Sequence, residues 1–312
     1  MKALLPATVR PMLEGRLPSE IEPLWWADGA ELVAQAPQAE IGWFDMFDKT
    51  APKQAVAAAS GLRWLNTIFS GVDWMPLSNL RQRGVVLTNG SGLTANLVAE
   101  FALMMMLAFA RDHAAIVRAA DRHKWLASVP LVTRELAGSR VLILGYGEIG
   151  QAIDRMLQGF RADTVAVRRQ PGPGTLGPHE WRAQLHTFDW VVLALPGTPE
   201  TRGLFDAATL AAMKPDAVLV NMARADVVDQ QALVAMLHAG TLGGAICDLT
   251  DPEPIPPGHP LWDAPNCHVT MHQAGLPTQN TRLVAADRFV ANCARYLAGE
   301  PLAAQVDLAL GY

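Results

Sequence analysis

The stretch VLILGYGEIG, residues 141–150, joins an apolar strand directly to the glycine pattern G-x-G-x-x-G. Gly145 permits a tight turn, Gly147 lets the backbone approach a phosphate, and Gly150 lets the following helix pack closely on the strand. That helix is expected to begin at about Ile149, where its free N–H groups and positive dipole end attract an anion. A site for a dinucleotide pyrophosphate is therefore predicted at Gly145, Tyr146, Gly147, Glu148, Ile149 and Gly150.

Further strands follow this loop, most of them separated by helical stretches such as 209–213 and 230–239. Six strands with helical crossovers indicate a doubly wound parallel sheet. A proline–glycine turn at 171–174 and a proline-rich loop at 251–260 interrupt the alternation. The six strands are predicted at 141–144, 164–167, 190–195, 217–221, 243–247 and 268–271.

The first hundred residues also alternate short strands with helices, which predicts a small parallel sheet wrapped by helices. Its strands are expected at 3–5, 41–44, 64–68 and 85–88. A long apolar helix is expected from Thr94 to about Ala120. A final helix at 279–297 leaves the second unit, and the tail at 303–312 is expected to pack on the first.

The predicted fold class is therefore α/β, with two Rossmann-like or flavodoxin-like domains built on doubly wound parallel sheets. Residues 1–97 and 281–312 form a discontinuous substrate domain. Residues 98–280 form a dinucleotide-binding domain inserted into it.

The composition of the chain limits which partners and locations are expected. The chain has 312 residues, half of them hydrophobic, and a net charge of −5, which gives no reason to expect nucleic acid or an acidic membrane surface as partner. No secretory signal is visible at residues 1–6. The longest apolar run, 101–110, falls short of the roughly 18 residues that span a bilayer. The three cysteines lack metal-type spacing, so reduced thiols, a cytoplasmic location and no metal site are expected.

The end of the second strand of this unit bears on the choice of coenzyme. An acidic residue there would hydrogen-bond the ribose hydroxyls of NAD, but the strand at 164–167 is followed by Arg168 and Arg169. A guanidinium makes charge-assisted contacts with a 2′-phosphate. NADP is therefore the preferred cofactor, with NAD possible; the alternative is that both arginines are solvated surface charges.

Three segments further along carry polar residues directly after strands: 220–229, 247–262 and 269–275. Ligands of open α/β sheets bind beyond the carboxyl ends of the strands, where all three segments are expected. Their arginine, glutamate and histidine suit the reduction of a 2-keto acid.

These segments closely resemble the D-isomer-specific 2-hydroxyacid dehydrogenase family, and the resemblance covers nearly the whole chain. It includes SGVD at 70–73, LTANLVAE at 93–100 and LPGTPET at 195–201. The length, the Arg168–Arg169 pair and the ending at 305–307 look most like the NADPH-preferring glyoxylate/hydroxypyruvate reductases.

The resemblance implies that Arg224, Glu253 and His272 are the catalytic residues. Arg224 would bridge the substrate carboxylate and keto oxygen, which fixes orientation and polarises the carbonyl. Protonated His272 would give its proton to that oxygen as hydride reaches carbon. Glu253 would stabilise the imidazolium and hold its tautomer.

The resemblance also implies which residues line the two ligands. Backbone N–H groups at Ser70, Gly71 and Val72 would receive the substrate carboxylate. Asp248 would face the nicotinamide carboxamide. The remaining residues placed along the cofactor are Leu195, Pro196, Thr198 and Ala223.

Several residues have simpler structural interpretations. Arg224 could merely pair with Asp226, Glu253 could be a solvated loop charge, and Asp248 could cap its loop. His259, before a proline, and Cys247 are interpreted as structural. Trp43 could reach over the substrate or belong to the core.

The chain departs from the family pattern at three positions. Met271 stands where proline usually precedes the histidine, so the loop that holds His272 is expected to be less rigid. Ala225 replaces the usual glycine after the arginine, at a cost of roughly 1 kcal/mol if that position needs positive φ. Gln230 replaces a common glutamate without evident catalytic consequence.

The sequence thus predicts an NADPH-dependent reductase of small 2-keto acids, with glyoxylate and hydroxypyruvate as leading substrates. A homodimer is expected from the apolar helix after Thr94 and from the resemblance. Formate oxidation is disfavoured, because that family pattern has glutamine where this chain has Glu253. A cofactor-sensing regulator or corepressor on the same fold is the alternative from another class.

Overall fold

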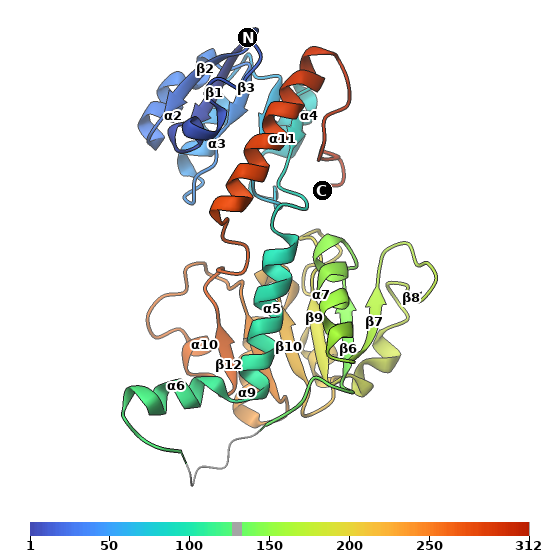
Figure 1. Ribbon diagram of the computed structural model, residues 1–312. Coiled ribbons are helices and arrows are strands. Elements are labelled where there is room, and N and C mark those ends of the chain that lie inside the picture. Colours follow the sequence, from blue (N-terminus) through green and yellow to red (C-terminus); the bar gives the residue numbers. More distant parts are fainter. Residues whose placement is uncertain (127–132, 312) are drawn as a thin grey trace. The chain divides into compact units, whose positions relative to one another are not determined.

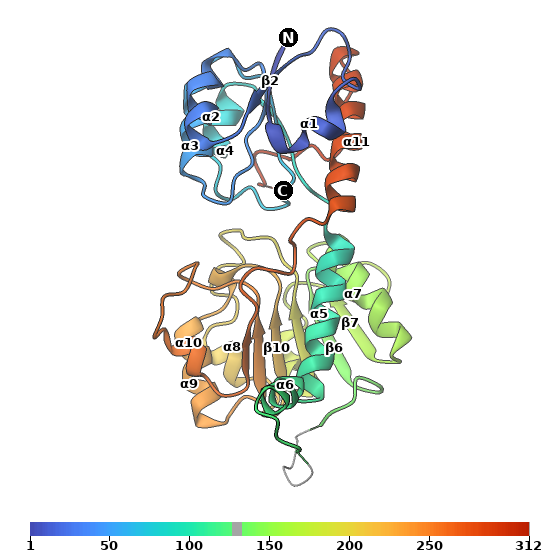
Figure 2. The ribbon, with the colours of Figure 1, turned by 60° about the vertical axis from the view of Figure 1, so that its left-hand side comes forward.

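The computed structural model describes residues 1–126 and 133–311, which divide into two compact units (Figures 1 and 2). Unit 1 comprises Met1–Thr94 and Pro277–Tyr312, and unit 2 comprises Ala95–Leu276. Unit 2 is thus one continuous segment inserted between two segments of unit 1. The chain passes between the units at 94/95 and 276/277, whereas the sequence placed these boundaries at 97/98 and 280/281.

Unit 1 is built on five parallel strands in the order β2-β1-β3-β4-β5. The described tail adds an antiparallel bridge from Gln305 to Thr88, and Val306 enters the core, as predicted. The strands are β1 (Lys2–Pro6), β2 (Glu22–Trp26), β3 (Ile41–Trp43), β4 (Trp64–Asn66) and β5 (Val86–Thr88).

Side chains alternate between the two faces of this sheet, and helices bury both faces. Leu4 and Leu65 point into one core, and Ala3 and Trp64 into the other. The first core is closed by α2 (Gly29–Gln35), α3 (Thr50–Ala58) and α4 (Leu77–Gln82). The second is closed by α1 (Arg10–Leu13) and α11 (Gln279–Leu297), whose Phe289 stacks on Trp64 at 5.0 Å between ring centroids. Two short 3-10 helices are η1 (Ala7–Val9) and η2 (Ala36–Gln38).

Unit 2 contains seven parallel strands in the order β12-β11-β10-β9-β6-β7-β8. Chain order reverses at β6, between β9 and β7, which is the topological switch point of a doubly wound sheet. The strands are β6 (Arg140–Leu144), β7 (Asp163–Val167), β8 (Thr175–Leu176), β9 (Trp190–Leu193), β10 (Val218–Asn221), β11 (Gly244–Cys247) and β12 (Cys267–Val269).

The fully apolar strands of unit 2 are buried on both faces, as parallel strands under two helical layers must be. Val141 and Ile143 face the core beneath α5 (Ala95–Ala110) and α7 (Glu148–Gly159). Leu142 and Leu144 face the core beneath α8 (Ala207–Ala211), α9 (Gln230–Ala239) and α10 (Pro260–Asp263). Figure 2 shows these two helical layers on opposite sides of the sheet. The remaining helices are α6 (His113–Asp121), η3 (Arg182–Thr187) and η4 (Ala225–Val227). The predicted α/β class with two parallel sheets is confirmed.

Two strands were missed by the sequence interpretation. β2 contains Pro23, which lacks a backbone N–H and argues against a strand, but β2 is an edge strand, where proline is tolerated. β8 is a two-residue edge strand after the proline–glycine turn, so the sheet has seven strands rather than six.

The single long helix predicted after Thr94 is wrong. α5 ends at Ala110 and α6 begins at His113, because Asp112 takes the left-handed conformation with φ 47°. Aspartate tolerates that conformation better than most residues. β12 ends at Val269 rather than at 271, so the segment before His272 is a turn.

Within residues 1–126 and 133–311, no helix is both long and apolar enough to cross a membrane. Across the same ranges, no three histidine, cysteine or acidic side chains gather as metal ligands would.

Candidate active site

The predicted site residues of unit 2 all follow strands of one parallel sheet. Gly145 follows β6, Arg168 follows β7, Leu195 follows β9, Arg224 follows β10, and Asp248 and His272 follow β11 and β12. The carboxyl ends of parallel strands lie at the same edge of a sheet, where such folds bind ligands. This edge of unit 2 is therefore the candidate active site.

The three glycines after β6 differ in what a side chain would meet at each position. Gly145 has φ 96°, and a Cβ there would fall 2.5 Å from the Ala194 carbonyl oxygen. A Cβ on Gly150 would fall 2.0 Å from the Gly145 oxygen, so the close approach of α7 to the loop requires glycine. A Cβ on Gly147 would meet nothing within 4 Å.

Gly147 therefore borders open space exactly where α7 begins, and it contributes no side-chain cap to the helix. An uncapped helix start with room above the backbone fits a pyrophosphate. The residues present thus fit a dinucleotide cofactor.

The side chain of Tyr146 turns toward α7. Its hydroxyl donates a hydrogen bond to Asp154, which also accepts one from the Thr164 hydroxyl at 2.5 Å. The bond to Asp154 raises the pKa of Tyr146. The phenol therefore joins the loop to α7, and Asp154 joins α7 to β7.

Arg168 and Arg169 are exposed at the end of β7. The Arg168 N–H donates to the Leu176 carbonyl at 3.1 Å, so pairing with β8 fixes its backbone while the guanidinium remains accessible.

The loop after β9 packs against Arg224. Thr198 N–H donates to the Thr201 hydroxyl at 2.9 Å, and that hydroxyl donates to the Pro196 carbonyl at 2.8 Å. A Cβ on Gly197 would fall 2.9 Å from Arg224 Cγ, so the arginine side chain runs directly over this glycine.

Arg224 is positioned by Asn221, a buried residue that the sequence interpretation missed. Asn221 Oδ1 accepts from Ala223 N–H at 3.0 Å, and its Nδ2 donates to the Arg224 carbonyl at 2.9 Å. Its signal was a polar side chain at the end of an apolar strand. Asp226, the proposed alternative partner of Arg224, pairs with Arg202 at 3.4 Å. Ala225 has no positive φ, so replacing glycine causes no strain here.

His272 and Glu253 meet although they lie in different loops. His272 Nδ1 is hydrogen-bonded to Glu253 Oε1, and the side chains remain 47% and 34% exposed. Glu253 is therefore not simply a solvated charge. The ring nitrogen Nε2 is the one left for a ligand.

Asp248 holds the loop that carries His272. Its buried Oδ1 accepts from the Thr270 hydroxyl at 2.6 Å and from the N–H groups of Gln273 and Ala274 at 3.0 and 3.3 Å. Its carbonyl accepts from His272 N–H at 2.7 Å. Burial raises the pKa of Asp248. The structural alternative, that Asp248 caps this loop, is thus confirmed, and a contact with nicotinamide stays a prediction.

Met271 and His272 both have φ 56°. Proline is locked near −65°, so it could not take the conformation of Met271. The departure from the family pattern therefore accompanies a particular turn, which the bonds to Asp248 fix in place.

Gln230 holds the loop that carries Glu253, a role that the sequence did not reveal. Its Nε2 donates to the Asp251 carbonyl at 2.7 Å, and its Oε1 accepts from Asp251 N–H at 3.2 Å. Glutamate at this position could accept but not donate. His259 Nδ1 accepts from Leu261 N–H at 3.2 Å and caps α10, so its predicted structural role is confirmed.

Two other residues belong to the cores. Cys247 lies in the core of unit 2, and its pKa is raised well above the ordinary value by the Cys267 thiol and by burial. Trp43 is buried in unit 1, 5.1 Å from Phe289 between ring centroids, so it is a core residue.

The predicted carboxylate-binding residues Ser70, Gly71 and Val72 lie in unit 1, in the loop after β4. The Asn89 side-chain amide donates to the Ser70 carbonyl at 2.8 Å, and Gly90 N–H donates to the Phe69 carbonyl at 2.9 Å. Within residues 1–126 and 133–311, no acceptor takes a hydrogen bond from the three N–H groups of 70–72. Three consecutive free donors suit a carboxylate.

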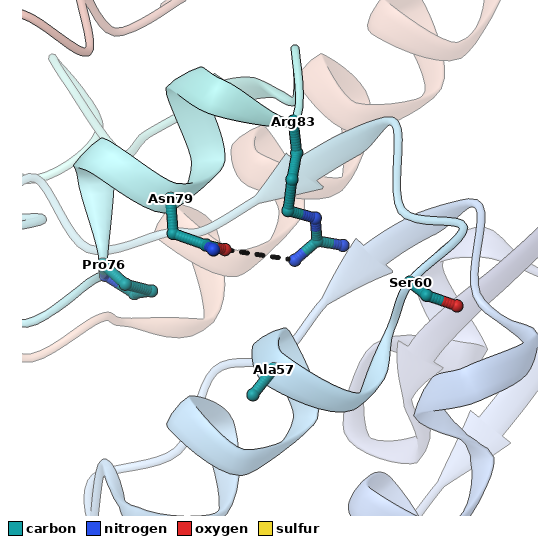
Figure 3. A pocket seen from close by; sticks show the side chains of 5 residues that line it. All are labelled: Ala57, Ser60, Pro76, Asn79 and Arg83. Carbon is teal, nitrogen blue, oxygen red and sulfur yellow. Dashed lines mark hydrogen bonds between the residues drawn. The ribbon is translucent and has the colours of Figure 1, made fainter.

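A pocket of about 500 Å³ lies elsewhere in unit 1 and contains none of the predicted residues (Figure 3). Its Arg83 donates to the Val56 carbonyl at 2.9 Å and to the Ala59 carbonyl, which closes the C-terminal end of α3. The guanidinium is thus occupied by the helix end. The lining residues are Ala57, Ser60, Pro76, Asn79 and Arg83.

Comparisons with known proteins identify the family of this chain. Residues 103–274 match the family model described as D-isomer specific 2-hydroxyacid dehydrogenase, NAD binding domain. The glyoxylate reductase/hydroxypyruvate reductase of Mus musculus is 31% identical over 319 residues, covering 97% of this chain and 96% of that protein.

Two solved structures match over the full length. A D-isomer specific 2-hydroxyacid dehydrogenase family protein from Aeromonas salmonicida has a TM-score of 0.87 and 27% identity, covering 98% of this chain and 99% of that one. An NADPH-dependent glyoxylate/hydroxypyruvate reductase from Sinorhizobium meliloti, in complex with NADP and malonate, has a TM-score of 0.82 and 26% identity, covering 99% and 97%. With its NAD-binding domain in unit 2, the chain belongs to the D-isomer specific 2-hydroxyacid dehydrogenases, an oxidoreductase family, as the resemblance predicted.

Proposed function

We propose that this protein is an NADPH-dependent reductase of small 2-keto acids, with glyoxylate and hydroxypyruvate as its leading substrates. The observation that carries the proposal is the Glu253–His272 pair, placed at the same sheet edge as Arg224 and the glycine loop. The names of the mouse and Sinorhizobium relatives support the choice of substrate. In this proposal unit 2 binds the coenzyme and unit 1 contributes to substrate binding.

Two groups hold the substrate. The free N–H groups of Ser70, Gly71 and Val72 receive its carboxylate. The Arg224 guanidinium, permanently charged, contacts the carboxylate and the keto oxygen. Charge that develops on that oxygen during reduction is then stabilised by a fixed cation.

His272 supplies the proton. Its Nδ1–H is directed to Glu253, so the proton for the keto oxygen is carried on Nε2. The negative charge of Glu253 stabilises the imidazolium before transfer. A bound reduced nicotinamide would supply the hydride to the carbonyl carbon. Oxidation of the product requires neutral His272, so it should be fastest at a higher pH than reduction.

The coenzyme preference rests on Arg168, which is accessible where an NAD-specific site would carry an acid. A 2′-phosphate would be neutralised there. Replacing Arg168→Gln should lower the ratio of kcat/KM for NADPH to kcat/KM for NADH. A wild-type enzyme that strongly prefers NADH would refute this part of the proposal.

Loss of NADPH absorbance with glyoxylate and hydroxypyruvate tests the activity. His272→Ala should lower kcat by about 10²- to 10⁴-fold. Arg224→Ala should lower kcat/KM by at least about 10²-fold while cofactor affinity, measured by fluorescence titration, changes little. Near-normal turnover in both variants would reject the mechanism.

The same assay separates the alternatives. Tight NADPH binding without oxidation by any 2-keto acid would favour the cofactor-sensing regulator. Reduction of NAD or NADP by formate would favour the formate oxidant instead.

A further inference from the structure

Lys49 is a partly buried cation in unit 1, in the loop between β3 and α3. Its Nζ lies 3.8 Å from the centroid of the Phe69 ring and 5.2 Å from that of Trp74. The ammonium also donates to the Met46 carbonyl. Burial lowers the pKa of Lys49, and the charges of Asp45 and Asp48 oppose that shift without cancelling it.

Both acids of this loop are already hydrogen-bonded. Asp48 accepts from the Thr50 N–H at 2.8 Å and from the Thr50 hydroxyl at 2.7 Å. Asp45 accepts from the Thr67 hydroxyl at 2.5 Å and from Trp43 Nε1 and Ile68 N–H, both at 2.7 Å. Across the part of the chain that the structure describes, Lys49 forms no ion pair with a carboxylate. An anion from outside the chain would therefore find an unpaired cation.

Trp74 supplies a donor without a partner. Its Nε1 is buried and has no hydrogen-bond acceptor among the described residues. Buried N–H groups are nearly always bonded in folded proteins, so an orphan in a ligand-binding region points to an acceptor that arrives with the ligand.

These donors flank the predicted substrate loop. Phe69 precedes Ser70, and Trp74 follows Val72 by two residues, so the side chains that hold Lys49 border the free N–H groups of 70–72. The two loops follow the neighbouring parallel strands β3 and β4 and therefore share one sheet edge. If the backbone N–H groups bind the carboxylate of the substrate, Lys49 and Trp74 remain for its other end.

We propose that Lys49 and the Trp74 indole N–H bind an oxygen beyond the keto carbon of the substrate. This oxygen is the hydroxyl of hydroxypyruvate or the second carboxylate of a short 2-keto dicarboxylic acid. The inference rests on the proposed function and makes Lys49 a specificity residue of the same site. Pyruvate, which presents a methyl group to the cation, is then selected against.

The experiment compares hydroxypyruvate with pyruvate, which differ by one hydroxyl group, in the full-length enzyme. Lys49→Met should lower the ratio of their kcat/KM values about tenfold or more, because the cation is replaced by an apolar chain of similar size. Trp74→Phe keeps an aromatic ring, removes the N–H and should shift the ratio in the same direction. The ratio of oxaloacetate to pyruvate should fall further in Lys49→Met, since that oxygen is charged.

Lys53→Met is the matched control, because it removes an exposed lysine on α3 outside this cluster and should not change the ratios. Equal losses for all substrates in Lys49→Met, or unchanged ratios in both Lys49→Met and Trp74→Phe, would overturn the inference and leave the proposed function standing. A wild-type enzyme that oxidises NADPH with no 2-keto acid would overturn the proposed function and this inference with it.

Discussion

Single side chains fix the loops that carry the candidate chemistry. Asn221 braces the backbone of Arg224, Gln230 braces the loop of Glu253, and Asp248 braces the loop of His272. Each of the three candidate residues thus lies in a backbone segment that a polar side chain of unit 2 holds. Such support limits side-chain and loop motion around the reacting atoms.

The raised pKa of Asp248 should make the stability of the protein depend on pH. The pKa of this side chain is raised by burial in the folded state, so the unfolded chain ionises first as pH rises from the ordinary value of 3.8. The folded state therefore loses stability between that value and the raised pKa. Asp248→Asn does not titrate and keeps the Oδ1 acceptor.

The measurement is urea unfolding of both proteins across this pH range. The unfolding free energy of Asp248→Asn, minus that of the wild type, should rise with pH and level off above the raised pKa. A difference that stays constant or falls would show that burial does not penalise this carboxylate. Asp248→Ala should be destabilised by about 1–3 kcal/mol at every pH, because three donors lose their acceptor.

The sequence pointed to the candidate catalytic residues but not to the residues that hold their loops. Arg224, Glu253 and His272 were found from motif order, which records chemistry along the chain. Asn221 and Gln230 were not predicted. The contacts of Asn221 depend on the turn that follows β10, and those of Gln230 depend on a loop that packs against the start of α9. Residue type alone carries no information about such tertiary neighbours.

At the scale of elements, the glycines of the loop after β6 differ in what surrounds them. Gly145 and Gly150 are required by backbone contacts within unit 2, whereas Gly147 has only open space beside it. We therefore expect Gly145 and Gly150 to be needed for folding and Gly147 for cofactor binding.

Gly150→Ala should lower the melting temperature strongly, because its Cβ would meet the Gly145 oxygen at 2.0 Å. Gly147→Ala should leave the melting temperature nearly unchanged and weaken NADPH binding at least about tenfold, because the methyl group occupies the space assigned to phosphate. Thermal unfolding and fluorescence titration measure the two effects. Equal NADPH affinity in Gly147→Ala and wild type would show that no phosphate lies there.

The turn before His272 gives another prediction. Met271→Pro introduces the residue that the family usually carries, yet proline cannot adopt φ 56°. Its unfolding free energy should fall by more than about 1 kcal/mol, and kcat should fall as His272 moves. Met271→Leu, which keeps the backbone options of the wild type, is the control. Full activity in Met271→Pro would mean that the turn has another conformation.

Element boundaries were predictable where apolar runs are continuous, as in β6 and β10. The predictions were wrong where one residue takes a conformation that its type usually avoids. A strand can contain Pro23 because β2 lies at the edge of its sheet. Asp112 separates α5 from α6 because its backbone takes the left-handed conformation. Both outcomes depend on neighbours in space rather than on local propensity.

At the scale of the whole molecule, α5 and α6 leave apolar side chains uncovered. Met104 and Leu107 on α5 and Ile116 and Val117 on α6 are 36–51% exposed. The buried residues of α5, such as Ala102 and Met106, pack in the core of unit 2, so its exposed residues lie on another face of the helix. Exposed apolar surface of this kind is typical of an interface between subunits.

We therefore expect a homodimer in which the exposed apolar side chains of α5 and α6 are buried between the subunits. The double variant Leu107→Glu, Ile116→Glu should sediment as a monomer. Burying two carboxylates in the interface without opposite charges beside them would cost too much free energy. Leu297→Glu, an exposed apolar position on α11, should sediment like the wild type. Unchanged sedimentation of the double variant would place any subunit contact elsewhere.

The insertion of unit 2 into unit 1 determines the order in which the protein can be made. The ribosome releases residues 1–94 first, but Phe289 of α11, which packs on Trp43 and Trp64, is translated only after all of unit 2. Until α11 is made, one apolar sheet face of unit 1 is covered only by the short helix α1, whereas all of unit 2 has already been translated. Chains stalled on the ribosome before α11 should therefore be cut by protease within residues 1–94 and resist it within unit 2, and the waiting segment is where a chaperone would act.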